Sequence, residues 1–247
     1  MKHTFFAPPE AVTDSTITFS ESESHHASRV LRIQSGEEVA VVDGEGNWYR
    51  TSIEILGRKK MVGTILEHKS DVGEPGYTLT VAVGTLKNVS RFETFLEKAV
   101  ELGVSHVTPV VTKRSEKSRI KRKRAEGIIT SAMKQSGRSR RTGLDDPLKF
   151  RKWMKQLPVK GEEFRAICHE GASETQSMEA TLSKSVSQRN MLILVGPEGG
   201  FTEEELNQAV DKGFVVVSLG PRYLRTETAA IVSAATIMLS NYGEGAA

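Results

Sequence analysis

The chain has 247 residues, enough for one large domain or two of ordinary size. With 38% hydrophobic and 26% charged residues and a net charge of +3, its composition excludes a disordered or collagen-like chain. No run approaches the roughly 18 apolar residues of a membrane span, and the N-terminus lacks a signal-peptide core. The single cysteine, Cys168, excludes an internal disulfide and a multi-cysteine metal site, so we expect a cytoplasmic protein.

The first 70 residues show the pattern of short β-strands. Four partly alternating, β-branched segments predict strands at 17–19, 38–43, 48–56 and 61–66. DGEGN at 43–47 is a strong turn signal, and HHASRVLRI at 25–33 interrupts the strands as a short helix. Several short strands with tight turns predict a small β barrel. SDVGEPGY at 70–77 then reads as a linker.

After the linker, strands alternate with helices. Apolar segments predict strands at 79–83, 106–111, 165–169, 191–195 and 214–219. Strands that are apolar on both faces and alternate with helices indicate a parallel sheet covered on both sides. We therefore expect two domains, a small β barrel over residues 1–72 and an α/β domain over residues 73–247.

Three helices can be placed by their caps and apolar stripes. Ser90 with Glu93 predicts one capping box, and Thr202 with Glu205 predicts another. The first helix is expected to end at Gly103. Its buried stripe is Phe92, Phe95, Leu96, Ala99 and Val100. A further helix is predicted by the apolar stripe Ala125, Ile128, Ile129, Ala132 and Met133.

Positive charge is concentrated in one segment. Residues 113–141, which we call the basic segment, carry twelve Lys or Arg and two acids, Glu116 and Glu126. The segment is therefore +10, while the rest of the chain is −7. A solvated helix face is the ordinary explanation of a charge run, but so large a local excess favours contact with a polyanion such as nucleic acid.

Three strands end in loops rich in glycine and charge. Glu170 and Gly171 follow one strand, GPEGG at 196–200 follows the next, and Gly220 to Thr226 follow the third. Ligands bind beyond the carboxyl ends of parallel strands, and glycine lets the main chain approach them. GPEGG alone could equally be a plain turn, and neither a dinucleotide fingerprint nor a P-loop is present.

Together these motifs closely resemble one family. GPEGGFTEEEL at 196–206 and GFVVVSLGPRYLRTETA at 213–229 resemble the SPOUT-superfamily methyltransferases that make N3-methyluridine in 16S ribosomal RNA. HHASRVLRIQSGEEVAVVDGEG at 25–46 is similar to that family's N-terminal PUA-like RNA-binding barrel. TKRSE at 112–116 and AMKQSGR at 132–138 add to the resemblance, which therefore spans nearly the whole chain.

The resemblance implies an α/β SPOUT-type parallel sheet with a C-terminal trefoil knot, a homodimer, and S-adenosylmethionine held by the three loops. The implied cofactor-binding residues are His169, Glu170, Leu194, Gly196, Pro197, Gly199, Gly200, Leu219, Gly220, Leu224, Thr226 and Glu227. The leucines could instead be plain core residues, and His169 could be satisfied locally. Because no His or Cys has metal-ligand spacing, we expect no metal.

Methyl transfer to uridine N3 requires loss of a proton, and negative charge then spreads onto O2 and O4 of the base. Arg225 is the predicted catalytic cation, and Glu198 or Glu227 is the base or an orienting group. The predicted RNA-binding residues are Arg29, Arg32, Arg114, Lys117, Arg124, Lys134, Gln135 and Arg138. Two alternatives stay open: a non-catalytic RNA-binding ribosome-assembly factor, and a methyltransferase with a different RNA target atom.

Overall fold

The structure is a computed structural model that describes residues 3–56, 60–116, 120–159, 163–173, 176–183 and 189–241. It divides into two compact units. The first comprises Met1–Glu74 and Ile129–Arg141, and the second comprises Pro75–Ile128 and Thr142–Ala247. The predicted domain limits at residues 72 and 73 stay a prediction.

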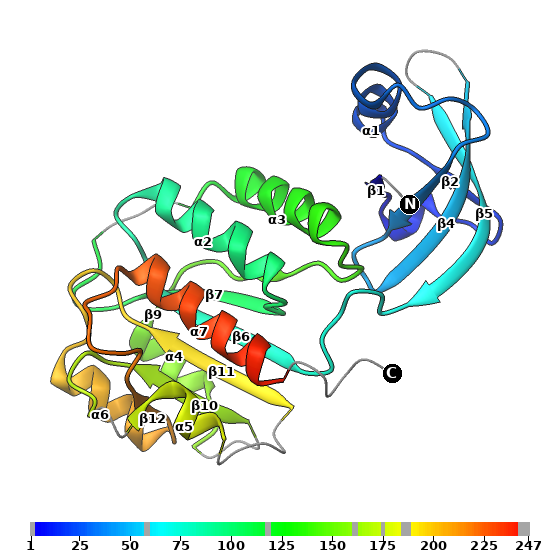
Figure 1. The fold of residues 1–247 in the computed structure, drawn as a ribbon. Coiled ribbons are helices and arrows are strands. Elements are labelled where there is room, and N and C mark those ends of the chain that lie inside the picture. Colours follow the sequence, from blue (N-terminus) through cyan, green and yellow to red (C-terminus); the bar gives the residue numbers. More distant parts are fainter. Residues whose placement is uncertain are drawn as a thin grey trace. The chain divides into compact units, whose positions relative to one another are not determined.

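The first unit is built on one curled sheet of five strands (Figure 1). Their order across the sheet is β1 (Thr4–Phe6), β3 (Glu38–Val42), β4 (Asn47–Ile55), β5 (Met61–Ser70) and β2 (Thr16–Thr18). Strand β1 runs parallel to β3, and the other pairs are antiparallel. The four predicted strands are present, and β1 was missed. The sheet is a curled half-barrel, with β1 and β2 at its ends.

A helical segment closes one side of this unit, as the sequence predicted. After the 3-10 turn η1 (Pro9–Ala11), the helix α1 (Glu21–His25) continues directly into the π-helical turn η2 (His26–Leu31). Ser20 caps α1 by accepting the N–H of Glu23 at 3.2 Å. Arg32 ends η2 in the left-handed conformation, with φ 55°.

The second unit contains a parallel sheet of seven strands. Their order is β12 (Val215–Val217), β10 (Phe164–Cys168), β11 (Asn190–Val195), β6 (Thr78–Gly84), β7 (His106–Val111) and β8 (Gly143–Leu144), and β9 (Leu148–Lys149) also pairs with β7. Every one of these pairs is parallel. The predicted α/β class and its five long strands are confirmed. The strand order does not by itself establish the trefoil knot, which stays a prediction.

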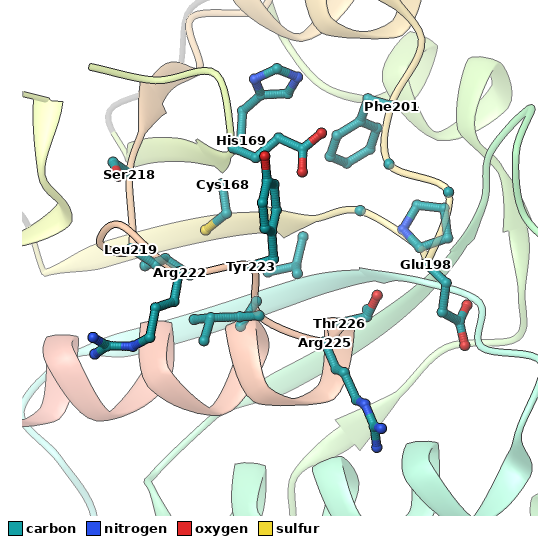
Figure 2. Close-up of a pocket in the computed structure, with 18 of the residues that line it drawn as sticks. Cys168, His169, Glu198, Phe201, Ser218, Leu219, Arg222, Tyr223, Arg225 and Thr226 are labelled. Atoms are coloured by element: carbon teal, nitrogen blue, oxygen red, sulfur yellow. The ribbon is translucent and has the colours of Figure 1, made fainter. Parts of the chain in front are cut away.

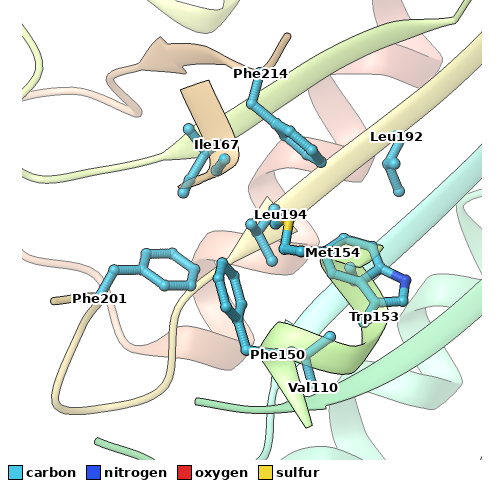
Figure 3. Close-up of a cluster of buried hydrophobic side chains, with 11 residues drawn as sticks. Val110, Phe150, Trp153, Met154, Ile167, Leu192, Leu194, Phe201 and Phe214 are labelled. Atoms are coloured by element: carbon cyan, nitrogen blue, oxygen red, sulfur yellow. The ribbon is translucent and has the colours of Figure 1, made fainter. Parts of the chain in front are cut away.

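Helices cover both faces of this sheet (Figure 1). The helices α2 (Val89–Glu101) and α7 (Thr226–Ser240) pack together, and α7 also contacts β6 and β11. The remaining helices are α3 (Arg122–Ser136), α4 (Phe150–Gln156), α5 (Met178–Leu182) and α6 (Glu203–Asp211). Leu192 and Leu194 of β11 pack with Trp153 and Met154 of α4 in a core cluster that also contains Ala209 of α6 (Figure 3).

One of the two predicted capping boxes is present. Thr202 and Glu205 form the expected capping box of α6, and the five predicted stripe residues of α2 are buried. The capping box predicted at Ser90 is wrong, because Asn88 is the N-cap and accepts the N–H of Ser90 at 2.9 Å. Glu93 cannot complete a box because its carboxylate binds Arg124. Of the α3 stripe, Ile128 is only half-buried.

Candidate functional site

A cavity of about 450 Å³ lies where β10, β11 and β12 end (Figure 2). That volume is in the range of small-molecule sites, and the carboxyl end of a parallel sheet is where such sites occur. Three loops line it, each following one of the strands. The lining residues are Arg114, Cys168–Glu170, Val195–Phe201, Ser218–Gly220, Arg222–Thr226 and Ala229.

The GPEGG loop is held by its neighbours. Phe201 at its end packs against Phe150 of α4, with ring centroids 6.2 Å apart. Arg114 donates from Nη1 to the carbonyl oxygens of Gly199 at 3.1 Å and Phe201 at 3.2 Å. Glu205 accepts the N–H of Lys113 at 2.7 Å in addition to its capping-box bonds. The start of the basic segment is therefore tied to this loop by hydrogen bonds.

Glycine is required where this loop meets the sheet. A Cβ on Gly84, the last residue of β6, would lie 2.3 Å from the main-chain nitrogen of Pro197. At Gly200 a Cβ would meet nothing within 4 Å, but φ is +67°, which favours glycine. The main chain of the loop therefore passes close to β6 on one side and remains open to the cavity on the other.

The loop after β12 forms another wall. Arg225 occupies the N-cap of α7, and no side chain caps this helix. Thr226, the first residue of the helix, is buried and also lines the cavity. Tyr223 is 89% exposed, which is unusual for an aromatic side chain at a cavity. In Figure 2 the side chains of Arg225 and Glu198 extend in the same direction, away from His169.

The end of β10 supplies a thiol and an imidazole. Cys168 forms a hydrogen bond between Sγ and Ser233 Oγ at 3.3 Å, and burial raises the pKa of its thiol to about 11. The thiol is therefore neutral near pH 7 and is no nucleophile. His169 accepts the N–H of Gly171 through Nδ1 at 3.0 Å, which is the local role that the sequence left open.

A charged cluster lies beside the cavity, with Arg91 of α2 at its centre. Arg91 Nη1 is 4.0 Å from Glu198 Oε1, and Arg91 Nε is 3.6 Å from Glu227 Oε1. The Glu227 side chain is 12% exposed, and its Oε2 is buried without a hydrogen-bond partner among the described residues. The site thus combines a lined cavity with a carboxylate pair that shares one arginine.

Most predicted cofactor-site residues and both predicted catalytic residues line this cavity. Leu194 and Glu227 do not: the Leu194 side chain is fully buried in the core cluster, and Glu227 turns towards Arg91. The prediction for Leu194 was a main-chain contact with adenine, which burial of the side chain does not test. Sequence reasoning missed Arg91, Cys168, Val195, Phe201, Ser218, Arg222, Tyr223 and Ala229. One signal pointed to Arg91: a cation in the first turn of a helix opposes the helix dipole and needs nearby acids.

The predicted RNA-binding residues differ in their exposure and in their partners. Arg29, Arg32 and Gln135 are exposed. Arg124 and Lys134 are paired with Glu93 and Glu23, each at 2.5 Å. Lys117 lies outside the described residues.

Arg138 and Arg114 have other partners. Arg138 is 3% exposed and binds Glu74 at 2.8 Å, so the structure does not offer its charge to a phosphate. A run of charges in the sequence does not reveal which of its members are buried, and RNA binding by Arg138 stays a prediction. Arg114 donates to the GPEGG loop instead.

The described residues contain neither a membrane-spanning helix nor a metal-binding cluster. None of the helices there is long and apolar enough to cross a membrane. No group of three or more His, Cys, Asp or Glu in that part of the chain could hold a metal ion.

Known proteins with the same domains match nearly the whole chain. Residues 74–238 match the model of an RNA methyltransferase domain, and residues 19–66 match that of an RNA methyltransferase PUA domain. Ribosomal RNA small subunit methyltransferase E of Synechocystis is 32% identical over 96% of this chain and 77% of its own. The protein of that name from Bacillus subtilis is 26% identical over 90% of this chain and 89% of its own.

Solved structures of similar proteins match this chain over nearly its full length. The crystal structure of ribosomal RNA small subunit methyltransferase E from Neisseria gonorrhoeae, bound to S-adenosylmethionine, is 28% identical. It covers 97% of this chain and 98% of its own, with a TM-score of 0.83. A putative methyltransferase from Legionella pneumophila, also with bound S-adenosylmethionine, has a TM-score of 0.82 at 27% identity and the same coverage. The chain therefore belongs to the family of RNA methyltransferases with a PUA domain that includes ribosomal RNA small subunit methyltransferase E.

Proposed function

We propose that this protein uses S-adenosylmethionine to methylate N3 of a uridine in 16S ribosomal RNA of the small subunit. The observation that carries the proposal is the convergence of three strand-end loops on one cavity, in a chain of this family. Similar proteins of known structure hold S-adenosylmethionine, and similar relatives are named for the small-subunit RNA.

The lining residues fit such a cofactor. Adenine is flat and apolar with a polar edge, and Pro197, Leu219 and Leu224 offer apolar contact beside open main chain. The sulfonium and the ammonium group of the cofactor are positively charged and suit a cavity that also contains the carboxylates of Glu170 and Glu198. When bound, S-adenosylmethionine supplies a methyl group on a sulfonium, which an aligned nucleophile can displace. Gly200 and Gly220, which have the positive φ that favours glycine, leave main chain without a side chain at two positions of the cavity wall.

The residues at the rim would then act on the uridine. Its N3 must lose a proton as it attacks, and negative charge develops on O2 and O4. Arg225 is exposed at the rim and always charged, so it can stabilise that charge. Glu198 lies at the same rim with a side chain that is 36% exposed, where it can orient the base or accept its proton.

RNA binding would use exposed cations on both units. Arg29 and Arg32 lie at the end of the first unit's helical segment, and Lys121, Arg122 and Lys123 are exposed in the second unit. Contacts of this kind bind phosphates and weaken with salt. The uridine must leave any helix to reach the cavity, so the target is single-stranded or flipped out.

A homodimer in the cytoplasm is part of this proposal. Helix α7, TETAAIVSAATIMLS, is apolar on nearly every side, and such helices are usually buried. Yet Leu239 is 67% exposed, and Ile231 and Val232 are half-exposed. A second copy packed on this helix would cover them. Sedimentation equilibrium should give twice the mass of the chain, and a monomer at micromolar concentration would contradict the dimer.

The direct test is methylation of small subunits and of free 16S ribosomal RNA from cells that lack the gene. Purified protein with labelled S-adenosylmethionine should yield one 3-methyluridine by nucleoside mass spectrometry, and Arg225→Ala should abolish turnover without changing the fold. Label in a ribose or another base nitrogen would change the target atom. Failure to bind S-adenosylmethionine at millimolar concentration would favour the non-catalytic alternative.

A further inference from the structure

We propose that Glu227, held in place by Arg91, is the group that accepts the N3 proton of the target uridine. The inference rests on the proposed function and assigns the one step that the cavity residues leave open. Glu198 and Glu227 both lie near Arg91, so the choice between them depends on their surroundings.

The two carboxylates differ in burial. The Glu198 side chain is 36% exposed, and water can satisfy it. The Glu227 side chain is 12% exposed, and its Oε2 is closed to water without a partner among the described residues. A buried acceptor without a hydrogen bond costs about 1–3 kcal/mol, more if charged, and such groups in native proteins call for an explanation. An arriving N–H donor would supply the missing bond.

Arg91 forms an ion pair with the other oxygen only. Its Nε lies 3.6 Å from Glu227 Oε1, while its Nη1 lies 4.0 Å from Glu198 Oε1. Both distances exceed a direct hydrogen bond, so Arg91 balances the charge of the pair without occupying Oε2. Arg91 lies on α2 and Glu227 on α7, two helices that pack together, so the arrangement is built on rigid elements.

The position of Glu227 suits contact with the uridine that accepts the methyl group, rather than with the cofactor. Glu227 does not line the cavity, whereas Arg225 and Thr226, its neighbours in the chain, do. A base that approaches from the rim meets Arg225 first, because Arg225 is exposed there. The oxygens of the base could then face Arg225 while its N3–H donates to Glu227 Oε2.

The step balances as follows. The N3–H bond breaks and its proton passes to Glu227 Oε2, leaving the electron pair on N3. That pair forms the bond from N3 to the methyl carbon. The carbon–sulfur bond breaks at the same time, and its electrons stay on sulfur, which becomes a neutral thioether. Glu227 later returns the proton to water.

The test compares E227Q, R91Q and R91K with the wild type under single-turnover conditions, with saturating cofactor and 16S ribosomal RNA. E203Q is the matched control, because Glu203 is an exposed acid in the first turn of α6 and lies outside the site. Affinity for S-adenosylmethionine, affinity for RNA and thermal unfolding are measured for each variant. The control should match the wild type in these three properties and in the single-turnover rate.

E227Q should lose about 10²–10⁴-fold in rate, the usual contribution of a general base. Its cofactor affinity should stay within twofold. Its rate should rise with pH in the alkaline range, where the uridine ionises without help, and a merely structural defect would show no such rescue. R91Q should lower the rate with unchanged KM for the cofactor, and R91K should restore part of it.

Four results would overturn the inference. E227Q with a rate within threefold of wild type removes Glu227 from the chemistry. A loss of cofactor affinity that matches the loss of rate makes Glu227 a cofactor ligand. Equal defects in R91K and R91Q remove the positioning role of Arg91. A wild type that methylates no uridine would overturn the proposed function itself, and this inference with it.

Discussion

The two ends of the basic segment differ from its middle. Arg114 at one end donates to two carbonyl oxygens of the GPEGG loop, and Arg138 at the other end is buried against Glu74. In the middle, Lys121 and Lys123 are exposed, with no ion pair among the described residues. Residues of one charge, in one run of sequence, therefore serve two purposes.

The difference shows that charge density and charge availability are separate properties. The sequence reveals the first, because it depends on composition alone. The second depends on partners that lie 64 residues away for Arg138 and 85 residues away for Arg114. An arginine with a satisfied guanidinium contributes to the fold or the cavity, and only the others remain for a polyanion.

The largest expected effect is at Arg138. Both side chains of the Arg138–Glu74 pair are nearly buried, at 4% and 7% exposed. Removing one partner of a buried pair costs about 3–5 kcal/mol because the other charge stays uncompensated. R138M should therefore lower the free energy of unfolding by that amount in urea titrations followed by circular dichroism.

The double variant E74M/R138M should recover only part of this loss. Glu74 also accepts the N–H groups of Ser139 at 2.9 Å and Arg140 at 2.8 Å, and these bonds are lost with it. If R138M unfolds within 1 kcal/mol of the wild type, the two ends of the segment are no more structural than its middle.

The next effect is on the cofactor. Arg114→Gln removes the charged donor that holds the GPEGG loop, and such hydrogen bonds contribute about 1.5–3 kcal/mol. We expect affinity for S-adenosylmethionine, measured by calorimetry, to fall by about tenfold or more. The salt dependence of RNA binding should not change. The opposite pattern would return Arg114 to the RNA-binding residues.

A smaller effect is expected from the middle of the segment. K121E/K123E should weaken binding of 16S ribosomal RNA and lower the slope of log affinity against log salt by about 0.7 for each lost phosphate contact. Cofactor affinity and unfolding should match the wild type. An unaltered slope would mean that these lysines only face solvent.

Arg124 lies between the two classes and should show the smallest effect. Its side chain is 63% exposed but bound to Glu93. Glu93→Gln should free it and raise RNA affinity by a factor of a few, because exposed pairs contribute only about 0–1 kcal/mol.

This gain from Glu93→Gln should depend on pH. The hydrogen bond from Arg124 lowers the pKa of Glu93, so the pair is complete at neutral pH. It is lost only as pH falls through that lowered pKa, and there the variant and the wild type should converge. A difference that persists in acid would assign the effect to another cause.

Much of the fold could be predicted from local sequence. Short apolar runs such as MLILV at 191–195, bounded by turn residues, predict buried strands, and the sheet contains all five that were predicted. The two-residue strands β8 and β9 carry no such pattern and were missed. The wrong cap of α2 has a similar cause, since Asn88 and Ser90 are both good caps and only the main-chain path distinguishes them.

The site divides in the same way. Its three loops could be predicted because glycine and charge at strand ends are local signals. The contact of Arg91 with Glu227 could not, because it joins residues 136 positions apart through the packing of two helices. The side chain of Leu194 is buried in the core cluster, and the predicted main-chain contact of Leu194 with the cofactor stays a prediction.

The central ladder of the sheet also constrains how the protein is made. β6 pairs with β11, and the side-chain hydrogen bond from Thr78 to Asn190 spans 112 positions. During synthesis, β6 cannot pair with β11 until about residue 195 has emerged from the ribosome. The cofactor cavity cannot precede that moment, so a truncated nascent chain has nowhere to bind it.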